Sequence, residues 1–189
     1  AWATLIIAAL IIAVTALGDL EGKPPVTRAG ARPGDIVAVT GRIGWAAAGL
    51  ATLSKGFRSP RAVVDAHRRP EPPYQAGPDA ARAGATSMVD VSDGLVADLG
   101  HVARASGVRI ALRRAAFAVP DALAQVASAF GVDPLDWILG GGDDHALVAT
   151  FASSAAVPAD WQAIGTVVAA EADSEGDVLV DGEPYRAGG

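Results

Sequence analysis

The chain has 189 residues, of which 51% are hydrophobic and 19% are charged, and its formal net charge is -6. This composition is typical of a folded globular protein and argues against disorder, and the acidic balance argues against a nucleic-acid partner, because phosphate backbones select basic surfaces. The absence of cysteine excludes disulfides and thiol nucleophiles and fits a cytoplasmic protein. An acidic protein that handles phosphates would need divalent cations as intermediaries.

The first 18 residues, AWATLIIAALIIAVTALG, carry no charge. Their length is at the lower limit for a membrane span, and no Lys or Arg precedes Lys23. Their β-branched clusters also suit a buried strand, which is the favoured interpretation, with a membrane or signal helix as the alternative. The chain begins with Ala1, and its only methionine is Met88, so we expect a fragment or a processed product.

After a turn region at 18–35, Gly, Pro and apolar periodicity predict strands and helices in irregular alternation. The pattern favours an α/β or α+β sandwich with a mixed β-sheet packed with helices. The expected elements are a strand at 35–41, helices at 45–53, within 59–78 and at 79–85, a strand at 86–92, a helix from 94 to about 106, a strand at 108–113, a helix at 119–131, a glycine turn feeding a strand within 139–151, and a hairpin turn at 181–182.

Three carboxylates crowd the segment SMVDVSDGLVADLGH, residues 87–101. On an extended strand Asp90 and Ser92 share one face, and the turn after Asp93 can bring the second carboxylate toward the first. Such oxygen ligands suit Mg²⁺, while Ser92 and the nearby helix N-terminus would add donors for an anion. The alternative is that Ser92 or Asp93 only caps the helix, which leaves Asp90 unexplained. Spacing alone leaves the two interpretations evenly balanced.

Asp98 and His101 lie on the helix that follows, and we interpret them as a surface charge and its i+3 neighbour. A second candidate site is GGGDDH, residues 140–145, where glycines allow a close backbone approach. Metal binding, cation recognition and a plain acidic turn all remain open for it.

Two weaker features could contact phosphate. The loop RIG, residues 42–44, joins a strand to a helix but lacks the residues of a P-loop, and a structural role is favoured. Arg28 and Arg32 could clamp a phosphate, although surface arginines are usually solvated. No nucleophile–base arrangement is present, so no catalytic residue is assigned. Any chemistry would depend on positioning phosphates and metal.

Three segments in this order, PVTRAGARPGDIVAVTGRIG, SMVDVSDGLVADLGHVARASGV and DPLDWILGGGDDHALVATF, closely resemble the C-terminal half of bacterial thiamine-monophosphate kinases. The resemblance runs from about residue 14 to residue 185. It implies ATP- and Mg²⁺-dependent phosphorylation of thiamine monophosphate to thiamine diphosphate. It also implies a fold similar to aminoimidazole ribonucleotide synthetase and selenophosphate synthetase.

The resemblance also implies roles for single residues. Asp90 and Asp93 match the family's Mg²⁺ ligands, while Ser92 and Arg28 match its ATP contacts. Asp143 stands where the family usually has a glutamate that contacts the thiamine substrate, so the charge is kept on a side chain one methylene shorter. Asp144 continues the motif without an assigned role.

The resemblance divides the chain into residues 1–18, the last strand of an N-terminal ATP-binding domain otherwise absent, and residues 19–189, a C-terminal domain slightly truncated at its end. It implies a cytoplasmic homodimer in the full-length protein, without nucleic-acid or membrane partners, and an inactive chain in isolation. The alternatives are a related synthetase acting on selenophosphate or aminoimidazole ribonucleotide, and a non-catalytic or membrane-tethered remnant.

Overall fold

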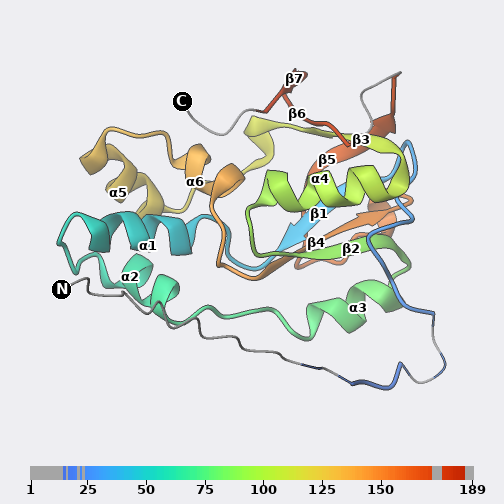
Figure 1. Ribbon diagram of the computed structural model, residues 1–189, viewed down its shortest axis with the longest axis horizontal. Helices are drawn as coiled ribbons and strands as arrows, with labels where there is room; N and C mark the ends of the chain where they lie inside the picture. The colour runs from blue at the N-terminus through green and yellow to red at the C-terminus, as the bar shows by residue number, and fades with distance from the viewer. Residues whose placement is uncertain (1–14, 16, 21, 23, 172–175, 186–189) are drawn as a thin grey trace, which may run out of the picture.

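The computed structural model describes residues 15, 17–20, 22, 24–171 and 176–185. Within these residues, seven strands form one mixed sheet in the order β2-β4-β1-β5-β3-β6-β7 (Figure 1). Neighbouring strands are antiparallel except for β3 and β6, which are parallel. The strands are β1 (Ile36–Thr40), β2 (Ala85–Val91), β3 (Val108–Leu112), β4 (Ala146–Phe151), β5 (Gln162–Ala169), β6 (Val178–Val180) and β7 (Glu183–Pro184). This architecture confirms the predicted mixed α/β class.

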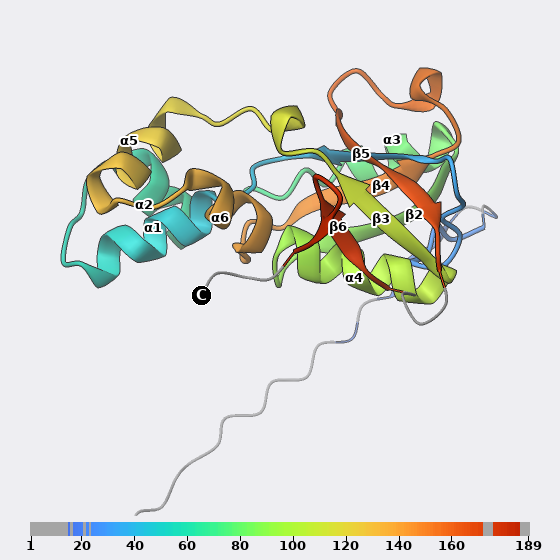
Figure 2. The same cartoon turned by 90° about the horizontal axis from the view of Figure 1, so that it is seen from above.

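Helices cover both faces of the sheet. Figure 2 shows α4 (Leu95–Ser106) on one side of the strands and α3 (Ala76–Arg82) on the other. Successive strand residues point to opposite faces, so β1 sends Val37 and Val39 into the core shared with α4, and Ala38 into a smaller core shared with α3. The sheet is therefore buried on both faces at its centre.

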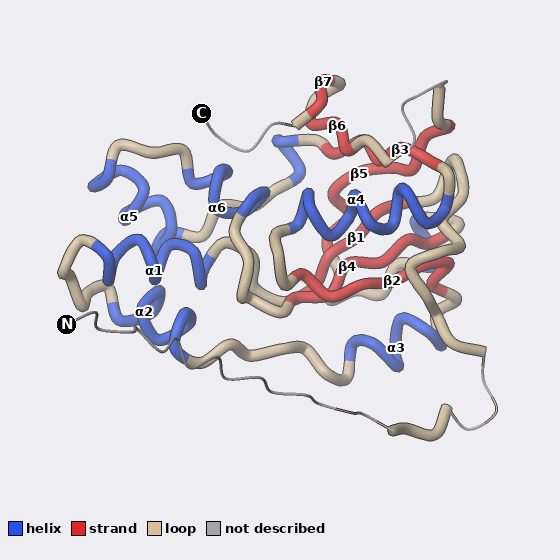
Figure 3. The backbone as a smooth tube through the Cα atoms, in the orientation of Figure 1, coloured by secondary structure: helices blue, strands red, loops and turns tan. Residues whose placement is uncertain are grey.

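The remaining α-helices gather at one end of the sheet, as the tube view in Figure 3 shows. Their core is continuous with that of α4 because Ala48, Val63, Leu123 and Ile138 belong to the same buried cluster as Leu99. The helices are α1 (Trp45–Ser54), α2 (Arg61–Arg68), α5 (Asp121–Phe130) and α6 (Pro134–Gly140), and two 3-10 turns lie at η1 (Arg114–Ala116) and η2 (Ser154–Ala156).

Elements with strong end signals lie close to their predicted positions. The helix α4 ends at Gly107, whose φ of 64° is the left-handed cap expected of glycine, and Asp181 and Gly182 turn the chain between β6 and β7. The helix predicted at 79–85 lies three residues earlier, because Ala85 already pairs with Phe151 in the sheet. The helix α6, the strand β5 and the two 3-10 turns were not predicted.

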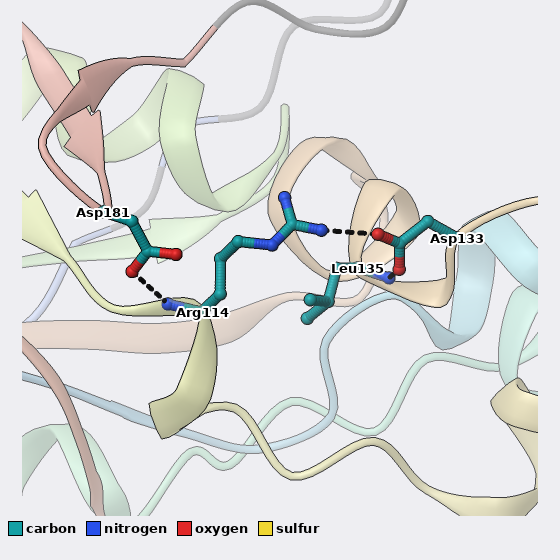
Figure 4. A network of polar contacts seen from close by, with 4 residues as sticks. All are labelled: Arg114, Asp133, Leu135 and Asp181. Atoms are coloured by element: carbon teal, nitrogen blue, oxygen red, sulfur yellow. Dashed lines mark hydrogen bonds and ion pairs between the residues drawn. The ribbon is translucent and has the colours of Figure 1, made fainter.

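A polar network near the C-terminal hairpin orients α6 (Figure 4). The Arg114 backbone N–H donates to the Asp181 carboxylate at 3.1 Å, and the Arg114 guanidinium pairs with Asp133. The other Asp133 oxygen accepts the Leu135 N–H at 2.9 Å and so caps the N-terminus of α6. Because α6 runs directly into Gly140, this network helps to place the glycine-rich loop.

The strand expected within residues 1–18 falls almost entirely outside the described residues. In the part of the chain that the structure describes, the helices are too short or too polar to cross a bilayer.

The crossing of α1 and α2 gives a test of the helical packing. A Cβ added at Gly49 would lie 2.1 Å from the Val63 carbonyl oxygen and 2.7 Å from the His67 Cβ. We expect Gly49→Ala to lower the free energy of unfolding by about 1–3 kcal/mol, because the helices must separate. Gly77→Ala in α3 is the control: its Cβ would meet only ordinary contacts, so helix propensity should stabilise it. Urea denaturation followed by circular dichroism measures both. A Gly49→Ala protein as stable as wild type would contradict the packing.

Candidate functional site

The two predicted acidic motifs lie against each other at one end of the sheet. In the antiparallel pair of β2 and β4, Val91 lies opposite Ala146. Beyond these strands the His145 N–H donates to the Val91 carbonyl at 3.0 Å, and the Asp143 N–H donates to the Ser92 carbonyl at 2.9 Å. We call residues 90–94 the DVSD loop and residues 140–145 the GGGDDH loop. Main-chain hydrogen bonds therefore hold the two loops together.

Gly142 serves this contact, because a Cβ there would lie 2.3 Å from the Ser92 carbonyl oxygen. Gly141 instead allows a close approach to α6, since a Cβ there would lie 2.4 Å from the Trp137 carbonyl oxygen. In the facing loop, Gly94 has a φ of 128°, and a Cβ there would lie 2.7 Å from the Gly140 oxygen. The close approach that glycine permits is thus an approach of protein backbone to protein backbone.

Three carboxylates remain exposed on these loops, those of Asp90, Asp93 and Asp143. Val89 and Val91 are buried on the α4 side, so strand alternation directs Asp90 to the α3 side. There its carboxylate lies 3.8 Å from the His145 Nδ1. Exposed carboxylates such as these suit Mg²⁺, which takes one or two carboxylates and keeps other positions for water and phosphate.

A pocket of about 450 Å³ adjoins Asp90 on this side of the sheet. Its lining is mainly apolar and comes from β2, β4, the GGGDDH loop, α3 and the segment before α3. It consists of Pro72, Pro73, Tyr74, Gly77, Met88, Asp90, His145 and Leu147. The arrangement places a carboxylate at the edge of an apolar wall, which suits a ligand that is part ring and part charged group.

Asp98 is not a surface charge, so that prediction is wrong. Its side chain is 3% exposed, and its Oδ2 accepts the backbone N–H groups of Ser92, Asp93 and Gly94 at 2.9, 3.0 and 3.2 Å. The capping interpretation of the motif is also wrong, because Gly94 is the N-cap of α4 and no side chain from Ser92 or Asp93 caps it. The backbone N–H groups of Ser92, Asp93 and Gly94 are therefore already bonded within the chain. The spacing of the motif gave no signal that Asp98 reaches back beneath it.

The hydrogen-bond partner of His101 is Arg104, not Asp98. The His101 Nδ1 lies 3.0 Å from the Arg104 guanidinium, at i+3 on the exposed side of α4. The carboxylates of Asp93 and Asp98 and the His101 ring nevertheless place one ligand atom each within 4.8 Å of one another. His101 therefore lies near the DVSD loop.

Asp144, which had no assigned role, is a buried structural carboxylate. It is 5% exposed, and its Oδ1 accepts the Ala46 N–H at 2.9 Å. This bond caps α1, whose own N-cap residue, Gly44, has no side chain to do so. Burial raises the pKa of Asp144 to about 6, opposed by backbone N–H groups and by the charge of Arg42. The helix that follows the loop at 42–44 is thus capped by a side chain of the same chain, which supports a structural role for this loop.

The backbone of Arg28 lies far from these two loops. The Arg28 carbonyl accepts from the Ser106 hydroxyl at 3.2 Å, at the C-terminal end of α4. The DVSD loop lies at the other end of this 12-residue helix, a separation of about 18 Å along its axis. Arg32 lies in the same region, where its N–H donates to Asp35 at 3.0 Å.

Comparisons with known proteins show which proteins the chain is similar to. Residues 32–177 match the family described as "AIR synthase related protein, C-terminal domain". The chain is 49% identical over 176 residues to a thiamine-monophosphate kinase of Mycobacterium tuberculosis, which covers 93% of this chain and 51% of that protein. A solved structure described as AaThiL complexed with AMPPCP and TMP has a TM-score of 0.77 and 32% identity, over 85% of this chain and 52% of that one.

A second solved structure, thiamine monophosphate kinase from Aquifex aeolicus, has a TM-score of 0.76 and 32% identity, over 85% of this chain and 54% of that one. The chain therefore spans about half the length of the relatives that it matches.

The buried carboxyl of Asp144 predicts a pH dependence of stability. Since its pKa is about 6 in the folded protein, against 3.8 for an ordinary aspartate, the folded state binds this proton more tightly than the unfolded chain. The contribution of Asp144 should lower the free energy of unfolding as pH rises from about 4 to about 6, by ~3 kcal/mol. Asp144→Asn keeps an oxygen acceptor for the Ala46 N–H and removes the charge, so its advantage over wild type should grow across this range.

Urea denaturation between pH 4 and pH 7.5 measures this difference. Asp143→Asn is the matched control, because the neighbouring side chain is exposed and its substitution should change the profile far less. A difference between Asp144→Asn and wild type that stays constant with pH would contradict the assignment.

Proposed function

Because the chain belongs to the family of AIR synthase related C-terminal domains and matches one half of known thiamine-monophosphate kinases, we propose that the protein phosphorylates thiamine monophosphate to thiamine diphosphate with ATP and Mg²⁺. The observation that carries this proposal is that main-chain hydrogen bonds join the two loops, whose side chains include the exposed carboxylates of Asp90, Asp93 and Asp143. A likeness to a structure described as holding AMPPCP and TMP supports it.

We infer that Asp90 and Asp93 bind Mg²⁺. Asp90 is the last residue but one of β2, and Asp93 lies two residues after the strand. Both carboxylates are exposed, and neither accepts the backbone N–H groups that bond to Asp98. When bound, the ion supplies positive charge beside the phosphate oxygens of ATP. The task of the chain is to keep the two carboxylates at fixed positions on a loop whose backbone is bonded to its neighbour.

We infer that Asp143 contacts the thiamine substrate. Thiamine monophosphate carries a cationic thiazolium ring, to which an exposed carboxylate is complementary. The backbone of Asp143 is left-handed, with a φ of 65°, and its N–H is bonded to Ser92. The Cα of Asp143 therefore has a fixed position relative to the DVSD loop. From that position the aspartate side chain, one methylene shorter than the usual glutamate, would contact the thiazolium ring.

For ATP, the proposal assigns contacts to Ser92 and Arg28. Ser92 lies between the two proposed metal ligands and is partly buried. Arg28 is exposed at the far end of α4, so its assignment rests on the resemblance of the surrounding segment. No side chain in this arrangement acts as a nucleophile, and transfer would depend on alignment and charge stabilisation.

The proposal includes a cytoplasmic location and a homodimer for the whole protein. A cysteine-free chain fits a reducing compartment. The dimer follows from the family resemblance.

Substitution of Asp90 tests the proposal. In the complete protein, we expect Asp90→Ala to lower turnover by 100-fold or more with the fold intact, because a charged ligand is lost from the metal. The assay follows formation of ADP that depends on thiamine monophosphate, and circular dichroism checks the fold. Asp121→Asn, an exposed carboxylate at the start of α5, is the control and should retain activity. Turnover near wild type in Asp90→Ala would refute the site.

A further inference from the structure

Three consecutive backbone N–H groups of the DVSD loop point at a single carboxylate oxygen of the same chain. The donors are Ser92, Asp93 and Gly94, and the acceptor is the Oδ2 of Asp98, at 2.9, 3.0 and 3.2 Å. A run of amides curled in this way forms a concavity that binds anions in many proteins. Here its occupant is an internal carboxylate that is 3% exposed.

This occupant changes the electrostatics of the loop. Three amide dipoles and the N-terminus of α4 would together favour a phosphate and disfavour a cation. The charge of Asp98 offsets them from below. The three amides then no longer oppose the exposed charges of Asp90 and Asp93, and a loop of the shape that usually holds phosphate becomes one that attracts a cation.

The same carboxylate also fixes the geometry of the loop. Three N–H groups of the DVSD loop are bonded to Asp98, while the carbonyls of Val91 and Ser92 accept bonds from the GGGDDH loop. Asp98 itself is held in place because Leu95 and Leu99, its neighbours on α4, are at most 1% exposed. The backbone that carries Asp93 is therefore bonded on both sides.

We propose that Asp98 is a positioning residue for cation binding, which sets both the charge and the shape of the DVSD loop without being a ligand itself. The inference rests on the proposed function, because it takes Asp90 and Asp93 as the ligands. Although Asp98 lies close to Asp93 and His101, the residue is only 3% exposed and its Oδ2 already accepts three donors.

The test measures metal affinity apart from activity. Mn²⁺ is the probe, and the paramagnetic resonance signal of the free ion reports binding to the complete protein. We expect Asp98→Ala to weaken Mn²⁺ binding by 10- to 100-fold, the usual effect of removing a group that orients metal ligands. Asp98→Asn keeps an oxygen acceptor and loses the charge, so it should weaken binding by threefold or more.

Asp35→Asn is the matched control for a loss of stability alone. Asp35 is another buried carboxylate, 4% exposed, whose Oδ2 accepts the Arg32 N–H at 3.0 Å and the Thr86 hydroxyl at 2.6 Å. It lies at the start of β1, beside the end of β2 that is remote from Asp90. We expect this variant to melt at a lower temperature than wild type and to bind Mn²⁺ with unchanged affinity.

The outcomes separate this inference from the function on which it rests. If Asp90→Ala leaves Mn²⁺ affinity unchanged, the metal site itself is wrong. If Asp90→Ala weakens Mn²⁺ binding but the Mn²⁺ affinity of Asp98→Asn stays within threefold of wild type, only the role of Asp98 is overturned. This conclusion does not require Asp98→Ala to fold. An equal loss of affinity in Asp35→Asn would also overturn it, since the effect would then follow stability.

Discussion

Two backbone hydrogen bonds, from Asp143 to Ser92 and from His145 to Val91, continue the pairing of β2 and β4 past the ends of the strands. They require the GGGDDH loop to lie so close to the DVSD loop that Gly142 has no room for a Cβ. This single constraint places the exposed carboxylates of two distant segments at one end of the sheet. Changing the distance between the loops would move Asp143 relative to Asp90 and Asp93.

Each acidic motif combines exposed and buried carboxylates with different tasks. Asp93 and Asp143 are exposed, whereas Asp98 and Asp144 are buried and accept backbone N–H groups at the starts of α4 and α1. The buried pair bonds amides that a helix N-terminus leaves without partners. One acid of each motif therefore builds the frame, and the other acids are left to meet a ligand.

The sequence was most informative where one residue type has one physical use. Gly107 and the Asp181–Gly182 turn marked their elements because left-handed backbone favours glycine and aspartate. The short helix α6 was missed because seven residues carry little periodicity. The strand β5 was missed because it buries only Ile164, Gly165 and Val167 among eight residues.

For the site, spacing identified both acidic motifs and left their chemistry open, and the resemblance then assigned the roles. The roles of Asp98 and Asp144 were not predictable from spacing, because both depend on burial by residues distant in the sequence. Asp98 follows the pattern of any acid in the first turn of a helix, a position where a surface charge is common. Only the packed structure shows which backbone groups these carboxylates reach.

The bonds beneath the DVSD loop also affect how this turn behaves in solution. An amide hydrogen in an exposed loop normally exchanges with water quickly, and a hydrogen-bonded one exchanges only when its structure opens. The acceptor for Ser92, Asp93 and Gly94 belongs to α4, so their exchange is tied to the opening of that helix. In its dynamics, the turn that carries the proposed metal ligands is an extension of α4 by three residues.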